Sequence, residues 1–212
     1  MAAAGPGGAP FWNERYGADE FAYGKEANAW LMEVAKDYVS EGMTVTELGA
    51  GEGRNAVWIA KEFSAKVTAV DMAHEGTAKT DRLAKELGAE VTAVTGDATK
   101  HGEDETNDVI VASFLHMPAT IRGGMWTNIC RTLKAGGVLI GEWYHPKQAI
   151  EKYGTGGPAD PSLCIDEAEV KTGLAEHGEM ILLETGERDI KEGLYHTGTG
   201  FTTRVIFRKA AK

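Results

Sequence analysis

The segment VTELGAGEGRN, residues 45–55, places three glycines between an apolar run and a helical pattern, and this turn constrains the fold more than any other part of the chain. Met43–Leu48 is short, apolar and partly β-branched, which predicts a strand, whereas Asn55–Phe63 repeats its apolar residues at a helical period. Glycines let a ligand lie against the backbone, and the N-terminus of the following helix offers free N–H groups and the positive end of a dipole. The turn therefore predicts a ligand-binding α/β unit.

The same alternation of apolar runs and helical patterns continues along the chain. Further strands are predicted over residues 66–70, 90–94, 108–112 and 137–143, and further helices over 27–39, 76–87, 118–133 and 166–175. Two long strand patterns, 179–188 and 201–208, then follow each other without a helix between them, which is typical of an antiparallel pair. The predicted fold is α/β: a Rossmann-like, doubly wound, mostly parallel sheet of seven strands with an antiparallel C-terminal edge hairpin.

A chain of 212 residues suits one domain. We expect residues 1–10, MAAAGPGGAP, to be a disordered tail, because they lack the charged and apolar regions of a signal peptide. No apolar run reaches the ~18 residues of a membrane span. Cys130 and Cys164 stand far apart without the spacing of a zinc site or a disulfide framework, so no metal and a cytoplasmic location are expected.

The charge balance bears on the partner. The formal net charge is −10, from 22 basic and 32 acidic residues, and no basic stripe breaks the acidic pattern. Such a chain repels a phosphate polyanion. We therefore expect a small-molecule substrate, with neither nucleic acid nor membrane as a partner, and a monomer or weak homodimer.

Polar residues stand at the ends of the predicted strands, where open α/β sheets bind ligands. Asp71 ends the second strand in VTAVD, and a carboxylate there can accept both hydrogen bonds of a ribose diol. Asp97, in GDA after the third strand, can accept a hydrogen bond from an adenine amine. A dinucleotide is the other cofactor considered, but its GxGxxG fingerprint needs a glycine where Arg54 stands. Each acid also has a purely structural interpretation, Asp71 as a helix cap and Asp97 as a solvated loop residue.

Together the sequences ELGAGEG, VTAVD, GDA and LKAGG resemble, in order, the motifs of the class I S-adenosylmethionine-dependent methyltransferases, over about residues 11 to 209. The resemblance implies S-adenosyl-L-methionine as cofactor, with Glu47 placing its amine, Asp71 its ribose and Asp97 its adenine, against which Met72 packs. Ala50 stands where the family often has cysteine or threonine, but only the backbone is needed there. The cofactor-binding residues implied by the motifs are Glu47, Gly49, Ala50, Gly51, Arg54, Asn55, Asp71, Met72, Gly96, Asp97, Ala98 and Ser113.

A narrower resemblance concerns the ends of the chain. FWNERY at 11–16, FAYGKEAN at 21–28, LYH at 194–196 and RVIFRK at 204–209 are similar to the bacterial tellurite-resistance methyltransferases and their thiopurine or thiol S-methyltransferase-like relatives. That group acts on small soft nucleophiles. The resemblance implies one methyltransferase domain over residues 11–212, whose segment of about 11–40 forms an aromatic lid. Trp12, Tyr16 and Tyr23 are then expected to line the lid over the cofactor.

Methyl transfer is an in-line displacement at a sulfonium carbon, so the protein mainly aligns the nucleophile and excludes water. A thiol, selenol or tellurite nucleophile is largely ionised already, whereas an alcohol needs a strong base. His116, His145 and His196 stand beside predicted strand ends and are the candidate catalytic residues, with His196 first because the resembled group carries a histidine there. Arg204, on the last strand, is a candidate for attracting an anionic substrate.

Other functions stay open from the sequence. SFLHMP, residues 113–118, lacks the Asn-Pro-Pro-Tyr type of box that clamps a planar amine, which disfavours methylation of nucleic-acid bases. The alternatives are a cofactor-binding regulatory module without turnover, a small-molecule O- or N-methyltransferase, and a protein side-chain methyltransferase.

Overall fold

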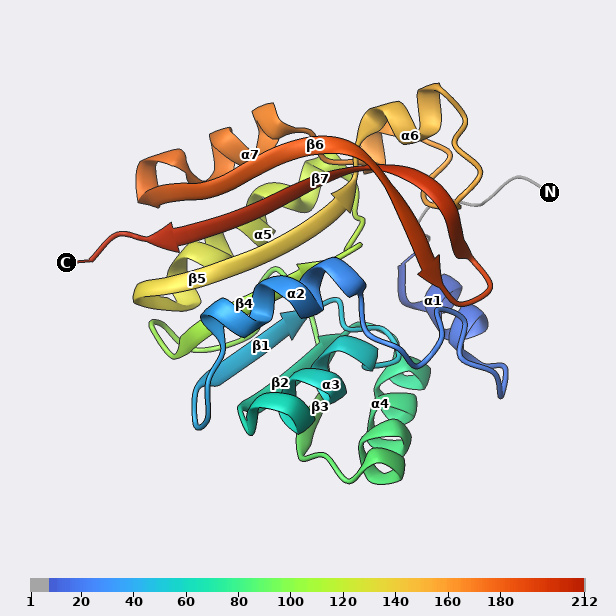
Figure 1. Ribbon diagram of the computed structural model, residues 1–212, viewed down its shortest axis with the longest axis horizontal. Helices are drawn as coiled ribbons and strands as arrows, with labels where there is room; N and C mark the ends of the chain where they lie inside the picture. The colour runs from blue at the N-terminus through green and yellow to red at the C-terminus, as the bar shows by residue number, and fades with distance from the viewer. Residues whose placement is uncertain (1–7, 212) are drawn as a thin grey trace.

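The computed structural model describes residues 8–211, and its centre is a seven-stranded sheet of order β3-β2-β1-β4-β5-β7-β6 (Figure 1). The first five strands are parallel, and β6 and β7 are antiparallel to their neighbours. The strands are β1 (Thr44–Leu48), β2 (Lys66–Asp71), β3 (Val91–Thr95), β4 (Asn107–Ser113), β5 (Leu133–Tyr144), β6 (Gly178–Glu192) and β7 (His196–Lys209). The predicted Rossmann-like α/β fold with an antiparallel C-terminal hairpin is confirmed.

Helices cover both faces of this sheet (Figure 1). They are α1 (Gly8–Tyr16), α2 (Ala29–Tyr38), α3 (Arg54–Phe63), α4 (His74–Leu87), α5 (Ala119–Thr132), α6 (Pro146–Ile150) and α7 (Glu167–Leu174), with 3-10 turns at Pro161–Leu163 and Ala175–His177. Among residues 8–211, no helix is long and apolar enough to cross a membrane.

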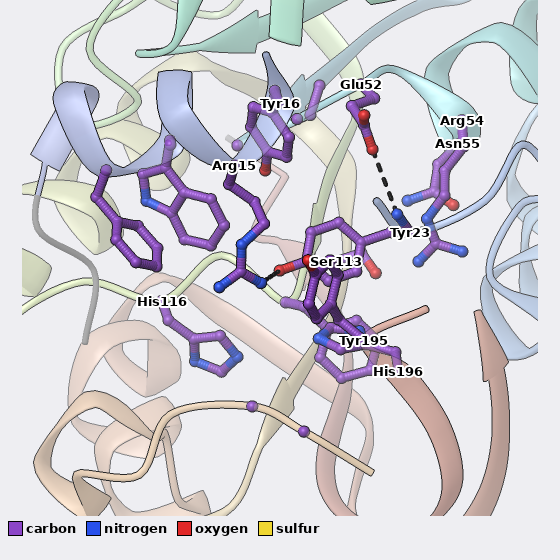
Figure 2. A pocket seen from close by; sticks show the side chains of 18 of the residues that line it. Arg15, Tyr16, Tyr23, Glu52, Arg54, Asn55, Ser113, His116, Tyr195 and His196 are labelled. Atoms are coloured by element: carbon purple, nitrogen blue, oxygen red, sulfur yellow. Dashed lines mark hydrogen bonds between the residues drawn. The ribbon is translucent and has the colours of Figure 1, made fainter. Parts of the chain in front are cut away.

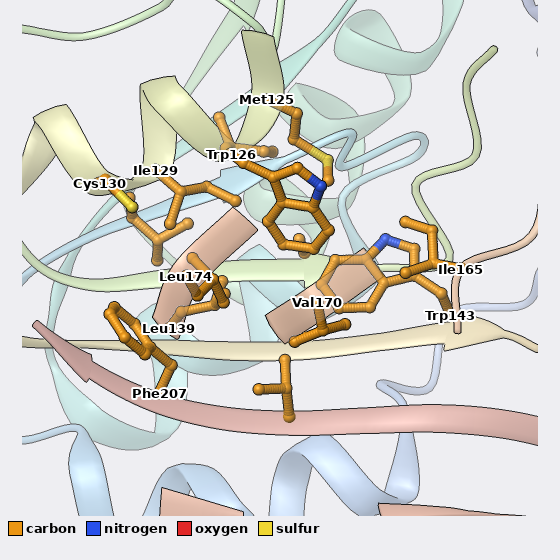
Figure 3. Close-up of a cluster of buried hydrophobic side chains, with 14 of the residues drawn as sticks. Met125, Trp126, Ile129, Cys130, Leu139, Trp143, Ile165, Val170, Leu174 and Phe207 are labelled. Carbon is orange, nitrogen blue, oxygen red and sulfur yellow. The ribbon is translucent and has the colours of Figure 1, made fainter. Parts of the chain in front are cut away.

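Two buried clusters fill the space between sheet and helices, because successive strand residues point to opposite faces. Val109 faces the cluster under α2 and α3, whereas Ile110 faces the cluster under α5 and α7. The second cluster contains Trp126 from α5 and Trp143 from β5, whose rings meet edge to face at 5.5 Å (Figure 3). A parallel sheet covered on both faces in this way leaves the carboxyl ends of its strands open, where ligands bind in open α/β folds.

Most predicted boundaries lie within one or two residues of the observed ones, and larger differences occur in three places. Residues 8–10 of the range expected to be a disordered tail belong to α1, which begins at Gly8; the other residues of that range lie outside the described part. A proline is tolerated in the first turn of a helix, where its missing N–H has no partner in any case, so Pro10 does not prevent this start. β5 begins at Leu133 rather than residue 137, since Leu133 pairs with Asn107 before the register shifts at Val109.

The hairpin is also longer than predicted. β6 runs on to Glu192 and β7 starts at His196, so that the hairpin tip extends beyond the rest of the sheet toward α1 (Figure 1). Apart from Ile190 the added residues are polar or glycine, and such residues do not make an apolar strand pattern. Their backbone pairing continues without interruption to the pair Glu192 and His196.

Candidate active site

A cavity of about 840 Å³ opens where β1 and β4 end, roofed by α1 and the segment after it and closed on one side by the hairpin tip. Its floor is the glycine turn with Ser113 and Phe114, its roof carries Trp12, Tyr16 and Tyr23, and its side carries Tyr195 and His196. Figure 2 shows Tyr16, Tyr23, Tyr195 and His196 around this space. Ligand pockets commonly measure ~300–1,000 Å³.

The glycine turn that follows β1 has a backbone conformation that is unfavourable for residues with a side chain. Gly49 has φ +70° and Gly51 has φ +56°, in the left-handed region that favours glycine. The Gly49 and Ala50 N–H groups both donate to the carbonyl of Val70, at 2.8 and 3.0 Å. This bonding fixes the turn to the neighbouring strand and leaves its surface bare on the cavity side.

Asp71 holds the other end of the turn. Its Oδ2 accepts from the Gly51 N–H and its Oδ1 from the Ala73 N–H, each at 2.8 Å. Burial raises the pKa of this carboxyl, and the backbone donors oppose that rise. Asp71 therefore fixes the turn through these hydrogen bonds. Each of its oxygens has a further lone pair that can accept a hydrogen bond, so the predicted role as ribose ligand is compatible with this structural role.

Glu47 and Asn55 connect β1 to the first turn of α3. Glu47 Oε1 accepts from Asn55 Nδ2 at 2.7 Å, and Glu47 Oε2 accepts from the Ala56 N–H at 2.9 Å. Burial raises the pKa of Glu47 to about 7. By accepting from an N–H group in the first turn of α3, Glu47 positions this helix, and it also lines the cavity.

A buried ionic network supports the site from behind. Arg54 pairs with Glu192, and Arg188 forms a two-point contact with Glu142 at 2.6 and 2.8 Å. Asn28 Nδ2 donates to Glu142 at 2.6 Å, while the Asn28 side chain caps α2. These contacts connect Asn28 at the start of α2 with β5 and with the hairpin. The side of the cavity that the hairpin forms is therefore held in place by buried charged groups.

The roof fits the turn closely. The Tyr16 ring lies against both Gly51 and Gly76, and a Cβ added at Gly51 would stand 2.8 Å from its hydroxyl. Trp12 stacks on Tyr16 with ring centroids 5.5 Å apart. Burial raises the pKa of Tyr16 well above its usual value, so its hydroxyl stays protonated.

Glu52 fastens the lid to the core. Its two carboxylate oxygens accept from the Ala22 and Tyr23 N–H groups at 3.2 and 3.3 Å, and Oε1 also pairs with Lys79 at 2.7 Å. Lys79 in turn donates to the carbonyl of Glu20 at 2.7 Å. One buried ion pair thus connects the glycine turn, α4 and the lid backbone.

Glu52→Gln is expected to lower the free energy of unfolding by ~3–5 kcal/mol, because it leaves the Lys79 ammonium buried without its counter-ion. The side chains of Lys79 and Glu52 are only 7% and 2% exposed. Denaturant titration of both proteins measures the difference. The matched control is Glu86→Gln, which breaks the half-exposed pair with Lys25 and should change stability by ~1 kcal/mol or less. Equal small losses in the two variants would contradict a lid fastened by Glu52.

Two histidines face an aromatic wall at the far side of the cavity. The His196 ring lies 4.5 Å from Tyr23, 4.9 Å from Phe114 and 5.3 Å from Tyr144, centroid to centroid. Its Nδ1 has no hydrogen-bond partner among the described residues and stands 3.9 Å from Glu192 Oε2. Burial lowers the pKa of His196, against the opposing effect of Glu192. The imidazole is consequently neutral at pH 7, with a carboxylate behind it that favours its protonation.

His116 is buried deeper and behaves differently. Its Nδ1 lies 3.2 Å from the carbonyl of Leu163, so Nδ1 is the donor and Nε2 keeps a free lone pair. Burial lowers the pKa of His116 to about 3. The residue lines the cavity as a neutral hydrogen-bond acceptor.

The structure gathers most of the predicted site residues but not all. Those lining the cavity are Trp12, Tyr16, Tyr23, Glu47, Gly49, Ala50, Gly51, Arg54, Asn55, Ser113, His116 and His196. Asp71 stands directly behind them through its bond to Gly51. Gly96, Asp97 and Ala98 follow β3 beside Asp71, whose carbonyl accepts from the Gly96 N–H, but they do not line the cavity, and neither does Met72, which is 45% exposed.

His145 and Arg204 lie elsewhere. His145 caps α6 by accepting from the Lys147 N–H at 3.0 Å, with Nε2 3.4 Å from Glu167. Arg204 pairs across the hairpin with Glu184, its register partner, at 3.3 Å. Neither residue lines the cavity: the partners of His145 lie in α6 and α7, and the partner of Arg204 lies in β6.

The Asp97 side chain is turned to its own loop. Its Oδ1 accepts from the Thr99 N–H at 2.9 Å and from the Thr99 hydroxyl at 2.6 Å, and Lys100 lies 3.1 Å from Oδ2. The hydrogen bond from the Thr99 hydroxyl is the main cause that lowers the pKa of this carboxyl. Asp97 as an adenine ligand therefore stays a prediction.

Arg15, Glu52, Phe114 and Tyr195 also line the cavity and were missed. Arg15 carried a signal in the sequence, since it follows Phe11 by four residues and so shares its helix face. Glu52, Phe114 and Tyr195 carried none, because their roles depend on contacts with segments more than twenty residues away.

A family model and several solved structures match this chain. Residues 45–137 match the family model described as a methyltransferase domain. A search of curated proteins found none that matches.

Solved structures are similar over most of the chain. One, on the conversion of a disulfide bond into a thioacetal group during echinomycin biosynthesis, has a TM-score of 0.72 at 16% identity, covering 95% of this chain and 91% of that one. A SAM-dependent methyltransferase of Methanosarcina mazei has a TM-score of 0.68 at 15% identity, covering 84% and 98%. TehB from Haemophilus influenzae has a TM-score of 0.67 at 15% identity, with 95% of this chain aligned to 66% of that one. At these identities the likeness concerns the fold.

Proposed function

We propose that this chain, an enzyme with a methyltransferase domain and S-adenosyl-L-methionine as its cofactor, methylates a small soft nucleophile: a thiol, a selenium or tellurium oxyanion, or a thiopurine-like heteroaromatic. The observation that carries this proposal is His196, a buried neutral histidine with an unpartnered nitrogen in an aromatic wall beside the glycine turn. Such a group suits a nucleophile that needs only a modest base.

The residues present fit the cofactor. A bare backbone turn with two left-handed glycines suits a flat ligand, Asp71 ends β2 with free acceptor capacity, and Glu47 and Ser113 add polar atoms at the floor. When bound, the cofactor supplies an electrophilic methyl group on a sulfonium. We assign Glu47, Gly49, Ala50, Gly51, Arg54, Asn55, Asp71 and Ser113 to its methionine and ribose, and Met72, Gly96, Asp97 and Ala98 to its adenine.

His196 is the proposed proton acceptor. It is neutral at pH 7 and can take the proton of a thiol, after which Glu192 at 3.9 Å stabilises the imidazolium. His116 contributes a second lone pair on the same side of the cavity, suited to orienting a donor on the acceptor. The aromatic rings around both exclude water from the reacting groups.

Sulfur chemistry is also named for one similar structure, on the conversion of a disulfide into a thioacetal. We propose further that residues 11–212 act as a single methyltransferase domain, as a monomer or weak homodimer. A cytoplasmic location is part of the proposal, since both cysteines are free and buried.

Transfer of labelled methyl from the cofactor to a panel of acceptors tests the proposal. The panel pairs each thiol with the alcohol and the amine of the same skeleton, and adds selenite, tellurite and a thiopurine. Labelling of the thiols or chalcogen oxyanions, with none of the matched alcohols and amines, is the expected result. Labelling of alcohols or amines only would replace the soft nucleophile by an O- or N-acceptor.

A further inference from the structure

Arg204, which the sequence suggested for an anionic substrate, lies outside the cavity. Among the residues described, two arginines line the cavity, Arg15 from α1 and Arg54 from α3. Arg54 is neutralised by Glu192 and also donates to the carbonyl of Glu26. Arg15, by contrast, has no carboxylate within 4.0 Å anywhere in residues 8–211. Its charge is available to a ligand.

The acidic side chains of the cavity do not cancel this charge. Glu52 is paired with Lys79 and with two backbone donors. Glu47 is held by Asn55 and the N-terminus of α3. Glu14 is exposed at the rim of the cavity. The interior next to Arg15 is thus deficient in negative charge.

Aromatic rings hold the Arg15 guanidinium in place. Its Cζ lies 4.1 Å from the centroid of the Tyr195 ring and 5.3 Å from that of Phe11. Nη1 also lies 3.5 Å from the Tyr23 hydroxyl, at the limit of a hydrogen bond. Because rings cover the face of the guanidinium, its edge N–H groups are left to donate, in the fork geometry that matches a carboxylate or an oxyanion.

The position of Arg15 relates it to the proposed base. Tyr23, which contacts Arg15, also lies 4.5 Å from His196, so one ring separates the cation from the proton acceptor. In Figure 2 the Arg15 side chain extends from the lid into the space between Tyr23 and His116. His116, which is buried, has an Nε2 without a hydrogen-bond partner. A polar ligand beside Arg15 could supply the missing donor.

We propose that Arg15 binds an anionic group of the methyl acceptor, a carboxylate or an oxyanion, and thereby selects acidic acceptors. The inference rests on the proposed function of the cavity and names its substrate class. The cofactor's own carboxylate has the same chemistry, so the experiment separates the two sources.

Binding of product analogues tests the inference without turnover. We use 3-(methylthio)propionate and its amide, titrated calorimetrically into protein saturated with S-adenosylhomocysteine. The wild type is expected to bind the acid about tenfold to a hundredfold more tightly than the amide, as a charge-assisted hydrogen-bonded pair allows. Arg15→Met should abolish this preference, and Arg15→Lys should keep part of it, because lysine retains the charge but not the fork.

Arg82→Met is the matched control. Arg82 is a half-exposed arginine that donates to the carbonyl of Asp19 and lies outside the cavity, so the preference should survive. Equal binding of acid and amide, binding of neither, or a preference that survives in Arg15→Met would overturn the inference. So would a loss of S-adenosylhomocysteine affinity in Arg15→Met, since that outcome assigns Arg15 to the cofactor carboxylate.

The two proposals fail separately. Methyl transfer to both 3-mercaptopropionate and its amide at equal efficiency would leave the proposed function standing and remove the role of Arg15. If the acid is preferred in an Arg15-dependent way but no methyl transfer occurs, the anion-binding role of Arg15 stands and the proposed methyl transfer is removed.

Discussion

His196→Gln is expected to lower kcat for thiol acceptors by ~10²–10⁴-fold while the affinity for S-adenosylhomocysteine stays unchanged. Glutamine keeps a polar side chain of similar length, so the aromatic wall remains filled, but it cannot accept and hold a proton. The cofactor affinity is preserved because His196 lies on the hairpin wall, in contact with Tyr23, Phe114 and Tyr144, rather than on the glycine turn. Steady-state kinetics and calorimetric titration measure the two quantities.

The pH profile separates a proton acceptor from a residue that only supports the wall. Burial lowers the pKa of His196, so wild-type kcat/KM should be constant at neutral pH and fall only on the acid side of the ordinary histidine pKa of 6.5. Without the base, the residual rate should rise tenfold per pH unit until the thiol itself ionises near pH ~8.5. His177→Gln, at an exposed histidine outside the cavity, is the control. Parallel profiles for wild type and His196→Gln would show that the histidine acts through packing.

Local patterns were sufficient for the sheet and the turn. Runs such as Val109–Ala112 are buried on both faces, and Gly88 ends α4 in the left-handed conformation expected of a stop signal. The turn at Gly49–Gly53 was predicted because its three glycines stand between a strand pattern and a helix pattern. Its hydrogen bonds to Val70 and Asp71 on β2 are long-range contacts that the pattern does not show.

The walls of the cavity could not be predicted in the same way. Arg204 was a candidate for an anion site, yet the hairpin register sets it opposite Glu184, and Glu184 forms an ion pair with it there. Arg15 reaches the cavity because Glu52 binds the lid backbone some thirty residues away. A single sequence shows that both arginines exist but not which one has a partner, because pairing depends on long-range register.

Gly51→Ala is expected to lower the affinity for S-adenosyl-L-methionine and S-adenosylhomocysteine by more than about tenfold, the effect of ~1.4 kcal/mol. Two causes add. The φ of +56° is unfavourable for any side chain by ~1–2 kcal/mol, and the new Cβ would stand 2.8 Å from the Tyr16 hydroxyl and 3.3 Å from its Cζ. Either the turn or the roof must move, and both bound the space that holds the cofactor.

Gly42→Ala separates these causes. Gly42 has a φ of +79° with nothing within 4 Å of an added Cβ, so this variant carries the backbone strain without the collision. Calorimetric titration should show undiminished cofactor affinity in Gly42→Ala, although both variants lose stability. Tyr16→Phe combined with Gly51→Ala removes the atom nearest the new Cβ and should recover part of the affinity. If Gly51→Ala binds the cofactor as well as the wild type does, the close fit of Tyr16 to the glycine turn has no part in binding, because strain and collision would both be tolerated there.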